Sequence, residues 1–460
     1  MSGILRTSLL ILFISLILSP DTYSQEMRRT GVLGAQLSPL SDSLAKASGV
    51  NINAGMVIAR TVEGATADKC GLKAGDIITE INGAVIGGNN KLQKAIRKLR
   101  EGDDITVKYQ REGKAGTAKG KVTGKQFEKS DKFEVIYDKV PFRGGWLRSI
   151  VTKPFGKEKL PAILLIQGYT CTTVDGLSPL HPYKQLTDTL TLKGYAVMRV
   201  EKPGVGDCIN TPDCFTMDIL TETEAFGAAF EYMKKYSFVD SNNAFIFGHS
   251  MGGIVAPLIA EKTNIKGVIV YGTDHLPWFE YLIKMLRFQN PGFGVDYIES
   301  ENDIKIYHRL LFEMLIEKKN IKQLTANPEY KRLLERDFML DEDGMLFTRS
   351  LEFQQSLQDL NMTESWSRTR GYVLSIFGEG DFEVMDSFGH ETIVDIVNTY
   401  NPGKAEYIFL PGTNHSMLLT GNMKESFEVQ NKGLTVQYFS KFNFRLTDEI
   451  DKWIKKIIKN

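Results

Sequence analysis

A serine stands in the sequence GHSMGG, where one apolar run passes directly into another. Gly248, Ser250 and Gly252 form the pattern G-x-S-x-G, which Gly253 extends. Glycines around the serine permit a tight strand-turn-helix that lifts the hydroxyl above a sheet. We therefore predict that Ser250 is a nucleophile, and the alternative is a structural glycine turn.

A serine hydroxyl becomes a nucleophile only when a base accepts its proton and a third group orients that base. When a serine follows a strand in this way, the acid comes next along the chain and the histidine last. Of the six histidines, His415 in PGTNHS fits this order best, whereas His390 is expected on a helix surface. Asp381, after the run YVLSIFGEG, is the preferred acid, with Glu379 as the alternative.

The developing oxyanion of an acyl transfer needs N–H donors. The N–H of Met251, directly after the serine, is the first candidate. The second is expected in the turn that follows the apolar run ILLIQGYT.

The elements that must position these residues are short apolar runs separated by helical segments. Runs rich in Ile, Val, Leu and Phe with helices between them indicate a parallel sheet covered on both faces. The preceding residues, FEVIYDKVPFRGGWLRSIVTK, predict an antiparallel hairpin at its edge, so the fold class is α/β. The predicted strands span residues 161–169, 195–204, 243–250, 266–273, 372–381 and 405–412.

A long segment, residues 277–369, separates the serine from the acid. Its amphipathic spacing predicts helices, and no parallel-strand pattern interrupts them. We interpret it as a helical cap over the catalytic face that shapes the pocket and limits water. The alternative is a helical elaboration at the side of the sheet.

The first folded unit, residues 28–125, is β-rich. Its β-branched runs predict strands at 54–62, 76–83 and 104–110, and the sequence NNKLQKAIRKLREG predicts one amphipathic helix. These elements form a small sheet with a helix against it.

The stretches TGVLGAQLSPLSDSLAKASGV and AGMVIARTVEGATADKCGLKAGDIITEING resemble a bacterial PDZ domain of periplasmic high-temperature-requirement proteases. This resemblance implies that the loop Val32, Leu33, Gly34 and Ala35 presents N–H groups to the C-terminal carboxylate of a peptide, which adds as a strand. The alternative is a groove that is empty or covered by the neighbouring domain.

Residues 131–460 resemble the α/β-hydrolase family, especially capped esterases and serine aminopeptidases, through GHSMGG, FGEGD and PGTNH. The resemblance implies that Tyr169, after the turn glycine, supplies the second oxyanion amide. This chain has Gln167-Gly168 where the family has His-Gly. The sequence EKPGVGD resembles the family's loop after its fourth strand, and Asp207 is expected to fix a turn there.

The N-terminal sequence predicts a signal peptide over residues 1–24, because Arg6 precedes the apolar run LLILFISLIL and small residues precede Gln25. An uncleaved anchor is the alternative. Export, to the periplasm or outside the cell, would allow disulfides. The spacing favours a bridge between Cys208 and Cys214, with Cys171 as a competing partner and free thiols as the other outcome.

The composition excludes several classes of protein. The 460 residues carry 56 basic and 56 acidic side chains, which argues against a nucleic-acid partner. The balance is uneven, since residues 25–130 hold 18 basic and 11 acidic side chains (+7) and residues 131–460 hold 37 and 44 (−7). We therefore hypothesise that the two units dock electrostatically. No metal-binding or nucleotide-binding motif appears, so no metal or other cofactor is expected.

Together these features predict an exported serine hydrolase that cleaves carboxylic esters through Ser250, His415 and Asp381, with a PDZ module for peptide binding or regulation. Expected partners are a small ester or peptide substrate and C-terminal peptides at the PDZ groove. No stable membrane span is expected in the mature chain. The alternatives are an aminopeptidase-like serine peptidase and a catalytically silent peptide-binding receptor.

Overall fold

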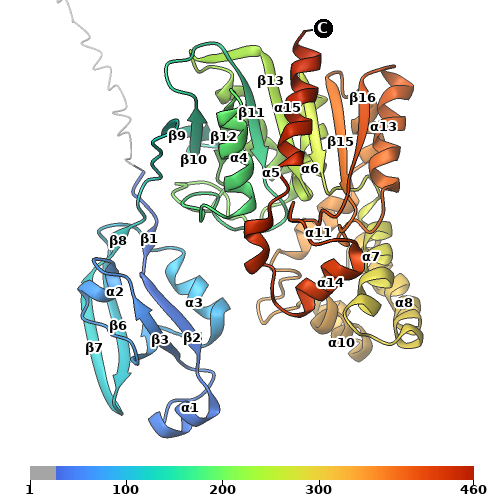
Figure 1. Cartoon of the computed structure of the whole chain (residues 1–460). Coiled ribbons are helices and arrows are strands. Elements are labelled where there is room, and N and C mark those ends of the chain that lie inside the picture. Colours follow the sequence, from blue (N-terminus) through green and yellow to red (C-terminus); the bar gives the residue numbers. More distant parts are fainter. Residues whose placement is uncertain (1–26, 460) are drawn as a thin grey trace, which may run out of the picture.

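The structure is a computed structural model that describes residues 27–459, so the predicted signal peptide lies outside the described residues. The chain forms two units, each built on its own large sheet (Figure 1). No helix of residues 27–459 combines the length and apolarity that a membrane span requires.

The first unit packs short helices against a sheet with the order β2-β3-β4-β6-β7, and β5 pairs with β4. β2 is an edge strand of this sheet, and the basic α3 is the predicted amphipathic helix. The elements are β1 (Gly31–Val32), β2 (Ala35–Pro39), α1 (Asp42–Ser48), β3 (Met56–Thr61), α2 (Thr66–Lys69), β4 (Ile77–Ile81), β5 (Ala84–Val85), α3 (Gly88–Ile96), β6 (Asp104–Arg111), β7 (Lys114–Lys121) and β8 (Thr123–Gly124).

The second unit contains an eight-stranded sheet with the order β16-β15-β14-β13-β11-β12-β10-β9. β11 to β16 run parallel, and the hairpin β9–β10 pairs antiparallel at one edge, as predicted. The strands are β9 (Glu134–Phe142), β10 (Gly145–Lys153), β11 (Leu160–Ile166), β12 (Ala196–Val200), β13 (Val239–His249), β14 (Gly267–Tyr271), β15 (Tyr372–Gly378) and β16 (Ala405–Leu410).

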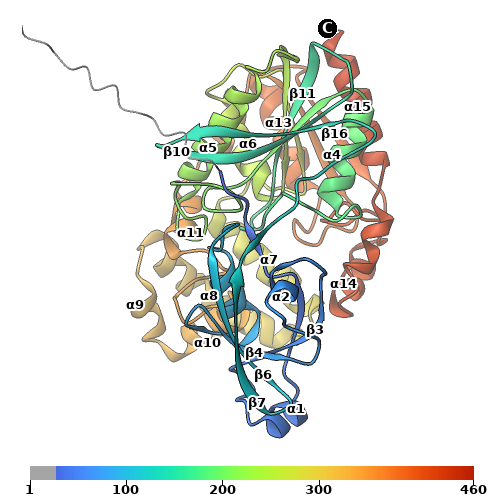
Figure 2. The same ribbon diagram turned by 90° about the vertical axis from the view of Figure 1, so that its left-hand side faces the viewer.

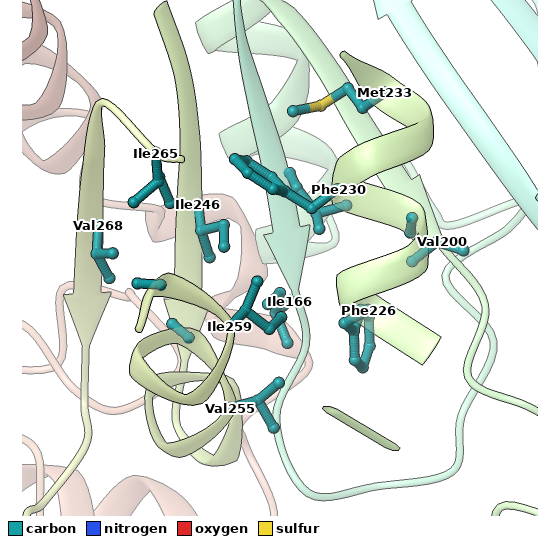
Figure 3. Close-up of a cluster of buried hydrophobic side chains, with 14 of the residues drawn as sticks. Ile166, Val200, Phe226, Phe230, Met233, Ile246, Val255, Ile259, Ile265 and Val268 are labelled. Carbon is teal, nitrogen blue, oxygen red and sulfur yellow. The ribbon is translucent and has the colours of Figure 1, made fainter. Parts of the chain in front are cut away.

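Helices cover both faces of this sheet because alternate side chains of each central strand point to opposite faces. In β11, Leu164 and Ile166 enter the core beneath one set of helices, while Ile163 and Leu165 enter the core on the other face. Figure 3 shows the first core, where Phe226 and Phe230 of α5 approach the strands. The helices of that face are α5 (Ile219–Met233), α6 (Met251–Ala260), α12 (Met362–Arg368) and α13 (Phe388–Tyr400), and those of the other are α4 (Pro182–Leu192) and α15 (Arg445–Ile458).

The segment between β14 and β15 adds no strand to the large sheet within the described chain, as predicted. Apart from α12, which packs in the first core of the sheet, its helices share a separate apolar core and lie beyond one end of the strands (Figure 1). They are α7 (Trp278–Gly292), α8 (Tyr297–Leu311), a π-helical turn (Phe312–Ile316), α9 (Ile321–Thr325), α10 (Pro328–Asp337) and α11 (Leu351–Gln358). Helix α11 also contributes Phe353 and Leu357 to the first core. After β16 come α14 (Met423–Asn431) and a 3₁₀ helix (Gln437–Lys441).

The two units meet through a buried ion cluster at the start of the first unit. The guanidinium of Arg29 pairs with Asp207 and, at 2.7 Å, with Asp175. The N–H and hydroxyl of Thr30 also donate to Asp207, at 2.7 and 2.9 Å. Asp207, expected only to fix a turn, therefore joins the units.

The first unit lies beside the helices of the insertion, as the two views show (Figures 1 and 2). Lys94 of α3 pairs with Asp343, and Arg97 pairs with Asp213 at 3.6 Å and lies over the ring of Phe215. The basic helix of the first unit and the residue that ends it therefore contact the second unit.

Candidate active site

Ser250 lies in the turn between β13 and α6. Its backbone has φ 55° and ψ −122°, an uncommon conformation that costs on the order of 1–3 kcal/mol and that occurs at functional sites. A Cβ at Gly248 would lie 2.3 Å from the carbonyl oxygen of Gly252, and one at Gly252 would lie 2.2 Å from that of Ile166. The glycines of the motif are therefore required by close backbone contacts, and the turn raises Ser250 into a cavity.

His415 and Asp381 form a hydrogen-bonded pair at the ends of neighbouring strands. The Nδ1 of His415 lies 2.9 Å from each carboxylate oxygen of Asp381, which is fully buried. Since Nδ1–H donates to the carboxylate, Nε2 of His415 is left free to act as a base. Glu379, the alternative acid, instead accepts the N–H of Gly412 at 2.8 Å.

Electrostatics set the charge states of this pair. Burial alone would lower the pKa of His415, but the charge and hydrogen bond of Asp381 outweigh it, and the pKa is raised above 6.5. Burial likewise acts to raise the pKa of Asp381, yet the charge and hydrogen bond of His415 leave it lowered. The pair thus favours the ionised form of Asp381 and the protonated form of His415 more than the free side chains would.

Gly272 permits the close approach of this pair to β14. Its φ is 63°, and a Cβ there would lie 2.8 Å from Asp381 Oδ2 and 2.9 Å from His415 Nδ1. Beside it, the hydroxyl of Tyr271 donates to the carbonyl of Asn414 at 2.6 Å and so holds the loop of His415. Sequence reasoning missed both residues, although a glycine near the end of the strand predicted at 266–273 was a usable signal.

Met251 and Tyr169, whose amides are the candidate oxyanion donors, line the same cavity as Ser250. Met251 is the first residue of α6, so no carbonyl of that helix can accept its N–H. Tyr169 follows Gly168, where an added Cβ would lie 3.2 Å from the Cβ of Ser250. Among residues 27–459, the N–H of Tyr169 has no hydrogen-bond acceptor. The oxyanion role of these two amides stays a prediction.

The cavity has a volume of about 760 Å³, and the three predicted catalytic residues lie at its wall or directly behind it. Ser250 and His415 line it directly, and Asp381 lies behind His415. The insertion supplies a large part of the remaining wall, with apolar side chains that include Trp278, Leu282, Met285, Met339 and Phe347 and with the polar side chains of Gln289, Asn290, Arg336 and Asp337. Glu383 brings a carboxyl group into this wall, and burial raises its pKa.

His390 is not a surface residue, contrary to expectation. It is fully buried on α13, where its Nε2 accepts the N–H of Thr273 at 3.2 Å and its Nδ1 lies 2.8 Å from the hydroxyl of Ser375. Burial lowers its pKa to about 4. With this lowered pKa the ring is neutral at neutral pH. Both ring nitrogens already have partners, so we assign His390 a structural role.

The predicted Cys208–Cys214 bridge is wrong. The disulfide joins Cys171 to Cys214, whose Cα atoms are 5.9 Å apart, while Cys208 is a buried free thiol. Cys171 had been the competing partner. The bridge connects the turn after β11 to the loop that holds Phe215, so it braces the backbone two residues from Tyr169.

The loop predicted to capture a carboxylate joins β1 to β2. The carbonyl of Val32 accepts the hydroxyl of Thr66 at 2.5 Å, and that of Leu33 accepts the N–H of Ala67 at 2.8 Å. In a trans peptide the N–H points away from the carbonyl, so the next amides, of Leu33 and Gly34, point away from α2. Ala35 begins the edge strand β2.

Comparisons with known proteins match the first unit to one class of protein and most of the chain to another. A PDZ domain model matches residues 31–122. The "Probable periplasmic serine protease do/HhoA-like" of Haemophilus influenzae is 36% identical over 94 residues, 20% of this chain and 20% of that protein. Esterase EstD of Thermotoga maritima is 22% identical over 350 residues, 73% of this chain and 74% of that protein.

One solved structure that resembles the chain is a soluble variant of monoglyceride lipase from Saccharomyces cerevisiae in complex with a substrate analog. It is 17% identical and covers 71% of this chain and 96% of its own, with a TM-score of 0.42. The chain therefore matches a fifth of the protease's length but about three quarters of the esterase's. Residues 31–122 are a PDZ domain, and the second unit, by its strand order, its serine turn and its similarity to an esterase, resembles the α/β-hydrolases.

Proposed function

We propose that this protein is an exported serine hydrolase that cleaves carboxylic esters through an acyl-enzyme. The observation that carries the proposal is the His415–Asp381 pair at the wall of the cavity that Ser250 also lines. Similarity to a protein named an esterase over most of the chain supports the choice of ester substrates. The intact trio of side chains disfavours a catalytically silent receptor.

In the proposed reaction, Ser250 attacks the ester carbonyl carbon while Nε2 of His415 takes its proton. Asp381 holds the imidazole in the required tautomer and stabilises its positive charge. The amides of Met251 and Tyr169 hold the oxyanion. The carbon–oxygen bond to the alcohol then breaks, His415 protonates the leaving alkoxide, and water hydrolyses the acyl-enzyme by the same route.

We propose that residues 277–369 act as a cap for this site. Helix α7 supplies Trp278, Leu282 and Met285 to the cavity wall, and the segment after α10 supplies Met339 and Phe347. An apolar enclosure of this size accommodates an acyl or alcohol chain and strengthens electrostatic interactions inside it by excluding water.

The carboxyl group of Glu383 favours a second candidate, a peptidase that acts on a free amino terminus. It lines the cavity beside His415, and its side-chain contact is Gln289 Nε2 at 3.5 Å. An ammonium group of a substrate would compensate such a carboxylate. Aminoacyl amides are therefore the substrates to compare with simple esters.

Export is supported by the N-terminal sequence and by the disulfide Cys171–Cys214, since disulfides persist in oxidising compartments. The similarity of residues 31–122 to proteases named periplasmic agrees with it. We place the mature protein in the periplasm or outside the cell.

Labelling by a fluorophosphonate probe tests the catalytic proposal. We expect the mature protein to be labelled at one serine and Ser250→Ala not to be labelled, because only an activated hydroxyl attacks the probe at a useful rate. Mass spectrometry locates the adduct. Assays of short acyl esters and aminoacyl amides then assign the substrate class.

Absence of labelling in the wild-type protein would overturn the enzyme proposal. Amide hydrolysis far above ester hydrolysis would replace the esterase by the peptidase. Equal labelling of Ser250→Ala would place the nucleophile elsewhere.

The PDZ domain is proposed to bind peptide C-termini at Val32, Leu33, Gly34 and Ala35. We expect a peptide with a free carboxylate to bind the full-length protein at least about tenfold more tightly than its amidated form, since a charge-assisted hydrogen bond contributes roughly 1.5–3 kcal/mol. Isothermal titration calorimetry compares the two peptides, with acidic and basic sequences as matched pairs. Affinity that is indifferent to amidation would exclude carboxylate capture.

A further inference from the structure

The peptide group between Gly168 and Tyr169 is held from below by a buried lysine. The Nζ of Lys202 donates to the carbonyl oxygen of Gly168 at 2.7 Å and contacts that of Tyr169 at 3.2 Å. Lys202 is fully buried and does not line the cavity, whereas Gly168 and Tyr169 do. The lysine therefore contacts this turn from outside the lining of the cavity.

This bond fixes the direction of the Tyr169 amide. The described chain contains no cis peptide bond, and in a trans peptide the carbonyl and the N–H point in opposite directions. A carbonyl of Gly168 directed at Lys202 thus directs the N–H of Tyr169 away from Lys202, in a turn whose residues line the same cavity as Ser250. A cation on the carbonyl also polarises the peptide and makes its N–H a stronger donor.

Lys202 belongs to a buried trio of charged side chains from three parts of the chain. Glu222 of α5 lies 2.7 Å from Lys202 Nζ and 2.9 Å from a guanidinium nitrogen of Arg349, which precedes α11. All three side chains have 0% exposure. Arg349 also donates to the carbonyl of Tyr169 at 3.1 Å. Two cations and one anion leave one net positive charge beneath the turn.

A buried trio of this kind is expensive, because each ion loses several kcal/mol of hydration that the attraction between partners offsets only in part. Its excess cation has carbonyl oxygens as partners in place of a second carboxylate. Positive potential at this place stabilises negative charge that develops at the Tyr169 amide. The trio thus contributes little to the stability of the fold, whereas its net positive charge stabilises the oxyanion of the transition state.

We propose that Lys202 is a positioning residue that aims and polarises the oxyanion-binding amide of Tyr169. The proposal rests on the proposed function, since it requires an oxyanion at Ser250. Lys202 acts through the peptide group and touches no substrate atom. Glu222 holds the ammonium in place, and Arg349 ties the insertion to the same turn.

Lys202→Met and Arg349→Met form a matched pair for the test. Each removes one buried cation and leaves a neutral ion pair with Glu222, but only Lys202→Met frees the carbonyl of Gly168. We expect Lys202→Met to lower kcat for a short acyl ester by about 10²-fold with KM changed less than about threefold, since the loss of one oxyanion donor costs roughly 10²–10³. Arg349→Met is expected to lose less than about tenfold.

Affinity for a trifluoromethyl ketone gives a second readout, because its hemiketal oxyanion uses the same amide as the transition state. We expect Lys202→Met to weaken that affinity by the same factor as kcat. Equal losses of kcat in the two variants, or a loss in Lys202→Met that lies in KM, would overturn the proposal.

Thermal unfolding establishes whether both variants fold. Should Lys202→Met not fold, the comparison passes to Lys202→Gln, which keeps a donor but loses the charge and is expected to lower kcat at least about tenfold. An unchanged kcat in Lys202→Gln would overturn the proposal. Failure of the wild-type protein to hydrolyse esters or to react with the fluorophosphonate would instead overturn the proposed function.

Discussion

Replacement of His415 by alanine is expected to lower kcat by about 10⁴ to 10⁶, the range found when a member of a serine triad is removed. The reason is that Nδ1 of His415 is committed to Asp381, and Nε2 is the proposed acceptor of the Ser250 proton. Without it, the hydroxyl retains its proton and attacks slowly. Steady-state assays of a short acyl ester measure the effect, and KM is expected to change little.

The matched control is His308→Ala, since His308 is an exposed histidine of α8. We expect its kcat to stay within about twofold of the wild-type value, as for most surface substitutions. A loss below tenfold in His415→Ala would remove His415 from the proposed mechanism. Thermal unfolding of both variants separates loss of the base from loss of the fold.

Much of the second unit could be predicted because its signals are local. Each central strand is a short apolar run, and burial on both faces makes such runs conspicuous. The serine turn could be located because close backbone contacts require its glycines. A side chain at Gly248 would meet the carbonyl of Gly252, and a side chain at Gly252 would meet the carbonyl of Ile166 in the neighbouring strand. His415 followed from the chain order of such a site, and the preference for Asp381 over Glu379 followed from the resemblance to the α/β-hydrolase family.

Strand β7 shows why part of the first unit could not be predicted. Its sequence, KAGTAKGK, holds one β-branched residue, Thr117, and has weak strand propensity. It pairs with β6 along its whole length because Glu112 and Gly113, both with positive φ, form a tight hairpin turn. The partner strand therefore determines this element more than its own composition does.

Long-range contacts account for the errors and omissions at the site. Cys171 reaches Cys214 across 43 residues, a pairing that the six-residue spacing to Cys208 concealed. His390 is buried because α13 packs against the sheet, which a helical pattern alone does not reveal. Lys202 looked like part of a turn, since its partner Glu222 lies 20 residues away in the sequence and Arg349, the other partner of Glu222, lies 147 residues away.

The opposite charges of the two units were expected to attract, and the contacts refine that hypothesis. Lys94–Asp343 and Arg97–Asp213 are partly exposed pairs, which typically contribute under about 1 kcal/mol and are screened by salt. The buried pair Arg29–Asp207 belongs to a different class, because removal of one partner leaves an uncompensated charge. Attachment of the units thus depends more on this buried cluster than on net charge.

Asp381→Asn is expected to change both the rate and its pH dependence. In the wild-type protein only neutral His415 accepts a proton, so kcat/KM rises with pH through the pKa of His415 and is lost below it. Since Asp381 raises that pKa, the midpoint of the rise is expected above 6.5. Removal of the carboxylate leaves burial as the main influence, so the midpoint should move to lower pH.

The rate of Asp381→Asn is expected to fall by about 10⁴, because an amide can hold the imidazole in the wrong tautomer. Other titratable groups also lie near His415, among them Glu383, His249 and His390. The charge of Glu383 also acts to raise its pKa, and His249, whose own pKa burial lowers to about 3, stays neutral throughout the assay range. Glu383→Gln is therefore the matched control, in which the midpoint should fall less than in Asp381→Asn. A midpoint in Asp381→Asn that equals the wild-type value would show that another group governs the profile and would remove Asp381 from its proposed role.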